Sequence, residues 1–278
     1  MTERDGSRLG LLLEASGGVV DPLALGGIAL GALSSCSLYV QTSLVGMGMG
    51  SVSVGDGLLW LMQGNPISLT FEWVMPWFLV ILAASRPGRE MTRGYGLGVC
   101  VQIGSRAKYW LMVALASCLR GVKVLAALYV GMSVAVLVMG GTPGLGAASS
   151  ATLTSGFFAN AIPAGGVMAF VGLTAAGAVA LALWQLVCTL VVGYLPAIAL
   201  SVVLLAASAW ASLVPLPGSW LMAYRVEPLV VAQTTFTHAY PLLAGVAVFV
   251  GLSLLLLGLG AVLLGRYEFG LSGTARHA

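Results

Sequence analysis

From Val167 to Val214 the chain carries no charged side chain. A helix needs about 20 apolar residues to cross the ~30 Å hydrocarbon core of a bilayer, so this run is long enough for two crossings. The stretch Gly193-Tyr194-Leu195-Pro196 is the natural break between them, at the inner face. The whole chain is 59% hydrophobic and only 8% charged, whereas a soluble domain carries roughly 25% charged residues. We therefore expect an all-α, multi-pass membrane protein.

The remaining apolar runs predict four more crossings, which makes six spans in one transmembrane domain covering residues 1–278. The other expected spans are Pro22 to Val45, Phe71 to Ser85, about Val122 to Met139, and Pro241 to Leu264. The helical pattern that begins at Ser105 is longer than the bilayer core, because a helix rises about 1.5 Å per residue. We expect its first half to be amphipathic and to lie near the inner surface. Arg120 and Lys123 would then mark the turn into the span, with side chains reaching the headgroups.

Gly27 and Gly31 form a GxxxG pattern in the first expected span. Such a pattern lets another helix approach closely. Ordinary packing within the bundle explains it better than a dedicated dimer seam.

The basic residues set the expected orientation. Seven of the twelve Lys and Arg residues lie between the second and third spans or at the start of the third: Arg86, Arg89, Arg93, Arg106, Lys108, Arg120 and Lys123. Loops rich in Lys and Arg stay on the cytoplasmic side. We therefore expect a cytoplasmic N-terminal segment (1–21), a cytoplasmic connector (86–110) and a cytoplasmic C-terminus, in the inner membrane of a bacterium. Residues 46–72, 140–166 and 215–240 form the outer segments, and Arg225 is the one basic residue outside.

Several classes of function are not expected. No HExxH, P-loop or GxGxxG pattern is present, and the two histidines, His238 and His277, lie outside the expected spans. We therefore expect no catalytic, cofactor or metal site in this chain. No water-exposed basic domain is available for nucleic acid. The expected spans also lack buried carboxylates, which argues against a carboxylate-based secondary transporter but leaves open sodium sites built from backbone carbonyls.

Two stretches resemble one protein family. Residues 104–110 read GSRAKYW and residues 217–225 read PGSWLMAYR. Both are similar to elements of ABC-transporter permeases of the export (type-two) class, the first to a basic and aromatic segment between the second and third spans, the second to an element before the sixth span. The chain departs from that family in lacking a long basic helix before the first span and in its short second span.

The resemblance implies a subunit that pairs with a second permease chain, the same or homologous, and docks cytoplasmic ABC-type ATPase subunits carrying ATP and Mg. It implies a coupling helix in the connector and a re-entrant outer gate segment before the sixth span. The connector residues are Arg89, Arg93, Tyr95, Arg106, Lys108, Tyr109 and Trp110. The gate residues are Pro217, Trp220, Tyr224 and Arg225.

The expected function is export of an amphipathic cargo, such as a peptide antibiotic, a toxin or a lipid-like molecule. Two alternatives stay open: an ion-coupled secondary transporter, and a non-transporting scaffold or immunity protein. Each segment also has a simpler explanation. The connector could be a plain positive-inside loop, and Trp220 and Tyr224 could anchor the chain in the headgroup zone.

Overall fold

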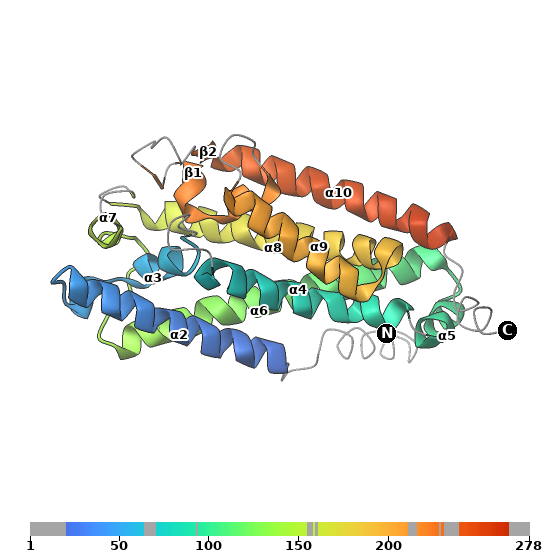
Figure 1. Ribbon diagram of the computed structural model, residues 1–278, viewed down its shortest axis with the longest axis horizontal. Helices are drawn as coiled ribbons and strands as arrows, with labels where there is room; N and C mark the ends of the chain where they lie inside the picture. The colour runs from blue at the N-terminus through green and yellow to red at the C-terminus, as the bar shows by residue number, and fades with distance from the viewer. Residues whose placement is uncertain are drawn as a thin grey trace, which may run out of the picture.

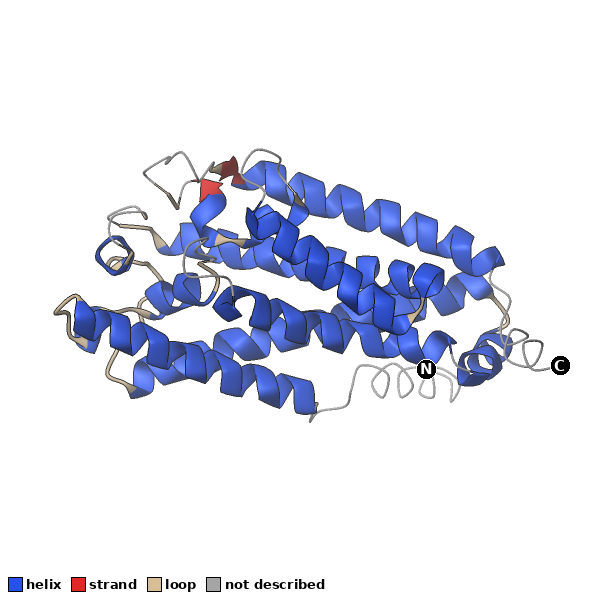
Figure 2. Cartoon of the chain, viewed as in Figure 1, coloured by secondary structure: helices blue, strands red, loops and turns tan. Residues whose placement is uncertain are grey.

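The computed structural model describes residues 21–63, 71–92, 94–154, 158, 161–210, 216–227, 229–230 and 239–266. These residues are mostly helical, with two very short strands at one end (Figure 2). Four of the described helices are long and apolar enough to cross a membrane: α2 (Pro22–Leu44), α6 (Arg106–Val138), α8 (Ala164–Val192) and α10 (Leu242–Arg266). By length and composition they mark the chain as a helical membrane protein.

Two shorter helices pack among these four. α4 (Phe71–Thr92) has 22 residues and contains Pro76 and Pro87, and it extends beyond the predicted end at Ser85. α9 (Tyr194–Trp210) has 17 residues. The predicted break between α8 and α9 is confirmed, because Gly193 adopts a φ of 89°, a left-handed conformation that a side chain would strain.

The prediction for residues 105–139 is wrong in its first half. α6 is one continuous helix of 33 residues, about 50 Å long, and it packs on α2, α4, α8 and α10. Arg120 does not reach a headgroup layer: it is 3% exposed, and its Nη2 lies 3.9 Å from the carboxylate of Asp21. The helix continues through this point, where the buried guanidinium faces the Asp21 carboxylate instead of a headgroup layer.

The α2–α6 crossing confirms that the GxxxG pattern serves packing within the chain. A Cβ on Gly31 would meet the backbone of Leu128 on α6, and a Cβ on Gly131 would meet the backbone of Ile28 on α2. Gly27 faces the carbonyl of Val124 in the same way. The two backbones therefore touch at positions where only glycine fits.

The long helices run between two ends of the bundle (Figure 1). The α5 end carries α5 (Gly94–Ile103), the end of α4 and the start of α6. The opposite end, called the α3 end, carries the remaining short elements. They are η1 (Met49–Ser51), α3 (Val54–Leu61), α7 (Ser150–Leu153), η2 (Pro217–Leu221), η3 (Ala223–Arg225), β1 (Val226–Glu227) and β2 (Tyr240–Pro241). β1 and β2 pair in parallel, Val226 opposite Tyr240.

Two apolar clusters fill the bundle. The larger one runs from the α3 end into the centre and includes Trp77, Leu128, Phe170 and Leu221. The smaller one lies at the α5 end and includes Met91, Trp110, Leu186 and Leu256. Both ends of the molecule therefore have a core of their own, joined by the long helices.

Candidate functional site

The connector between α4 and α6 is largely helical. α4 continues through Arg86, Arg89 and Glu90 to Thr92, and α5 follows at once. Gly104, with a φ of 70°, makes the turn into α6, and the Ser105 side chain caps that helix by accepting from the Lys108 backbone N–H. Arg93 and the side chain of Tyr95 lie outside the described residues.

The described basic residues of the connector, Arg89, Arg106 and Lys108, are exposed, and two of them contact other helices. The Arg89 guanidinium lies 5.4 Å from the ring centroid of Tyr194, at the start of α9. Arg106 Nη1 donates to the carbonyl oxygen of Gly265 at 2.6 Å. This carbonyl belongs to the last turn of α10, where the helix has no internal donor for it, so Arg106 caps α10. Lys108 lies two residues after Arg106 in α6 and is exposed.

Tyr109 and Trp110 lie inside the chain. Trp110 is 1% exposed, its Nε1 donates to the carbonyl oxygen of Leu257 at 2.9 Å, and a Cβ on Gly260 would overlap its ring. Both aromatic residues belong to the apolar cluster at the α5 end. The exposed surface of the described connector is therefore basic rather than aromatic, and Trp110 holds α6 against α10.

The four predicted gate residues come together at the α3 end, and three of them are buried. Arg225 is 2% exposed. Its Nη1 donates to the carbonyl oxygen of Ser208 at 3.1 Å and to Ser219 Oγ at 3.3 Å, and its Nη2 donates to the carbonyl oxygen of Ala209 at 2.9 Å. Ser208 and Ala209 stand in the last turn of α9, so the guanidinium satisfies carbonyls that the helix leaves open. Burial lowers the pKa of Arg225, yet a guanidinium stays charged in proteins.

The aromatic gate residues are covered by protein rather than facing a headgroup layer. The rings of Trp220 and Tyr240 lie 5.3 Å apart, and those of Tyr224 and Phe158 lie 5.1 Å apart. Burial raises the pKa of Tyr224 to about 12, so its phenol is neutral at physiological pH. Pro217 begins η2 and is half-buried.

Hydrogen bonds tie this segment to the helices beside it. Trp73 Nε1, near the start of α4, donates to the carbonyl oxygen of Leu221 at 3.0 Å. The backbone N–H of Ala223 donates to the carbonyl oxygen of Met62, just after α3, at 2.8 Å. α4 therefore contacts the gate segment at one end and carries the exposed Arg89 at the other.

Two acidic residues that sequence reasoning did not single out hold the fold together. Ser53 is the N-cap of α3 and Asp56 completes the capping box. The Asp56 carboxylate accepts from Ser53 N and Oγ, Ser149 N and Ser150 Oγ, at 2.7 to 3.1 Å. Asp21 caps α2 by accepting from the Leu23 N–H and also faces Arg120. The patterns Ser-x-x-Asp and Asp-Pro are signals of helix starts that could have located both caps.

Within the part of the chain that the structure describes, no group of three or more His, Cys, Asp or Glu side chains lies together in a metal-binding arrangement. Comparison with known protein families, with curated proteins and with solved structures finds no match for this chain.

Proposed function

We propose that the chain is the membrane-spanning permease subunit of an ATP-driven exporter of an amphipathic cargo. Separate cytoplasmic ATPase subunits bind ATP and Mg, and a second permease chain completes the transport path. The α5 end faces the cytoplasm, together with both termini. The gate segment at the α3 end lies on the outer side.

In this proposal α4 and α9 complete a set of six spans. With 22 and 17 residues, they measure about 33 and 26 Å at 1.5 Å per residue, close to the ~30 Å of a bilayer core. α4 is less apolar than the four long helices, but it is shielded by them: Trp73, Trp77, Val80 and Ile81 are all buried in the larger cluster.

The observation that carries the proposal is the path of α4. This one helix joins an exposed basic surface at the α5 end to the buried gate segment at the α3 end, through the hydrogen bond from Trp73 to the Leu221 carbonyl. α6 packs on both α4 and α10, and Arg106 and Trp110 fasten α6 to α10. A push on the connector by a closing ATPase would therefore reach the gate through continuous helices rather than through flexible loops.

Lys108→Glu tests the docking surface. Lys108 is exposed and follows the turn at Gly104, so reversing its charge repels an acidic partner surface while leaving the Arg106–Gly265 contact in place. Native purification from the host membrane should bring down an ATPase with the unmodified chain, and ATP hydrolysis in the sample should fall several-fold in the variant.

Glu227→Lys is the matched control. Glu227 is exposed in β1 at the opposite end, and its charge reversal should leave ATPase copurification intact. If the unmodified chain brings down no ATPase, the proposal fails. Transport by the chain alone in vesicles under a sodium gradient would then favour the ion-coupled alternative.

A further inference from the structure

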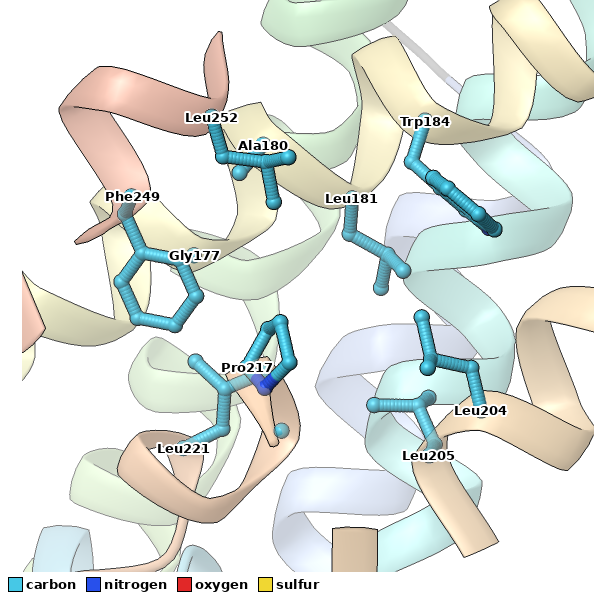
Figure 3. Close-up of a pocket in the computed structure, with 11 residues that line it drawn as sticks. Gly177, Ala180, Leu181, Trp184, Leu204, Leu205, Pro217, Leu221, Phe249 and Leu252 are labelled. Carbon is cyan, nitrogen blue, oxygen red and sulfur yellow. The ribbon is translucent and has the colours of Figure 1, made fainter. Parts of the chain in front are cut away.

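A cavity of about 140 Å³ lies against α8, between α9 and α10, and is closed at one side by η2. Figure 3 shows its lining side chains converging from these four elements. Among them are Gly177 and Leu181 of α8, Leu205 of α9, Pro217 of η2, and Phe249 and Leu252 of α10.

The chemistry of the lining selects its occupant. The side chains are hydrocarbon apart from the indole of Trp184. A buried water needs two to four polar partners, and a cavity of about 150 Å³ lined by Leu, Ile and Phe stays dry and binds benzene. An empty space of this kind leaves its lining atoms without van der Waals partners. A hydrocarbon group therefore fits the cavity, whereas water or an ion does not.

The cavity is partly open. α8 packs against both α9 and α10, while α9 and α10 make few contacts with one another. Both helices carry exposed apolar side chains, among them Val203 on α9 and Val250 and Leu254 on α10. Because the cavity lies between two helices whose exposed side chains are apolar, the hydrocarbon nearest to it in a bilayer is a lipid chain.

We propose that this cavity binds one acyl chain of a bilayer phospholipid, inserted sideways between α9 and α10. The bound chain lies against Pro217 and Leu221 of η2 and supports the gate segment from within the membrane. The site requires only a bilayer and does not depend on the export function.

The test uses the full chain, purified and reconstituted in phosphatidylcholine vesicles. A fraction of the lipid carries a photoreactive diazirine at the end of one acyl chain, and labelled residues are mapped by mass spectrometry after irradiation. Label is expected on Leu181, Leu205 and Leu252 as well as on the exposed helix faces. Ala180→Phe, which fills the cavity from α8, should lower labelling of these cavity residues at least several-fold.

Gly251→Phe is the matched control, because Gly251 stands next to Leu252 but has no described atom within 4 Å of its Cβ position. It should leave cavity labelling unchanged. Leu205→Ala widens the cavity and should increase labelling of Leu252. An increase in this second variant cannot come from misfolding, so it separates loss of the site from misfolding of the Ala180→Phe protein. Label confined to outer residues such as Val203 and Val250, or equal cavity labelling in all three variants, would overturn the proposal. Because no ATPase is present, the result is independent of the docking experiment.

Discussion

Buried charge is rare in this chain, and each described instance has a specific partner. Asp21 and Arg120 are each 3% exposed and lie 3.9 Å apart between the start of α2 and the middle of α6. Arg225 instead uses neutral carbonyls and a serine hydroxyl. The planar fork of arginine reaches several acceptors at once, which a lysine could not do. At both places the charge is stabilised by protein groups placed around it rather than by solvent.

Asp21→Asn tests the buried pair. Asparagine still caps α2, so the change removes the negative charge alone and leaves the buried Arg120 without its ion-pair partner. Breaking a buried pair in this way costs about 3 kcal/mol, and the thermal midpoint of the purified chain in detergent should fall by several degrees. Glu90→Gln is the control: its partner Arg86 is exposed, so the midpoint should hardly move. Equal, small effects of both changes would contradict the role assigned to Asp21.

At the scale of elements, glycines decide which helices touch. α2 and α6 meet through Gly31 and Gly131, and α6 and α10 meet where the Trp110 ring covers Gly260. Close contact of this kind matters in a membrane, because lipid is as apolar as leucine and helices associate through packing rather than through exclusion of water. The short α9 is held in a different way, because the Arg225 guanidinium donates to the carbonyl oxygens of Ser208 and Ala209 in its last turn.

Gly260→Ala and Gly258→Ala make a matched pair on α10. The methyl group at residue 260 would overlap the Trp110 ring, whereas no described atom lies within 4 Å of the Cβ position of Gly258. Overpacking costs about 1–3 kcal/mol, while Gly→Ala at an open helix position gains roughly 0.5–1 kcal/mol. Thermal unfolding followed by tryptophan fluorescence should therefore show a lower midpoint for Gly260→Ala and an unchanged or higher one for Gly258→Ala. If the thermal midpoint shifts in the same direction in both variants, the tight α6–α10 contact is excluded.

At the scale of the whole molecule, the two ends have separate apolar cores and are joined by continuous helices. α4 is the most direct connection. Its Trp73 hydrogen-bonds the gate segment, while Gly88, one turn from its other end, lies against Leu186 and Thr189 of α8. Motion of α4 would therefore displace both cores together.

Trp73→Phe removes the hydrogen bond to the Leu221 carbonyl but keeps most of the aromatic volume. On the proposed function, ATPase binding should persist while cargo export in vesicles falls several-fold, because the gate is uncoupled from the connector. Trp60→Phe is the control, since the Nε1 of Trp60 is buried without a partner among the described residues. Loss of export in both variants, or in neither, would show that this hydrogen bond does not couple the two ends.

Several features were predictable because their cause is local. The start of α2 at Pro22 follows from Asp21 as cap and proline in the first turn. The break at Gly193 follows from a glycine before a tyrosine and a proline-containing turn. The turn at Gly104 and the cap at Ser105 lie in the stretch singled out for its basic and aromatic residues. These signals act within a few residues of each other, so sequence alone carries them.

The sequence by itself determined that this is a helical membrane protein and, to within a few residues, the bounds of α2, α8 and α10, because burying backbone polar groups in lipid requires helices and helices require apolar runs. Only the tertiary structure decided that α6 is continuous, that Tyr109 and Trp110 face inward, and that Arg225 caps α9. Each of these depends on an atom supplied by a segment distant in sequence: Asp21 for Arg120, the Leu257 carbonyl for Trp110, the Ser208 carbonyl for Arg225. The sequence pattern of a charged or aromatic residue at the edge of an apolar run is the same whether that side chain contacts lipid headgroups or another helix. The packing of the bundle makes that choice.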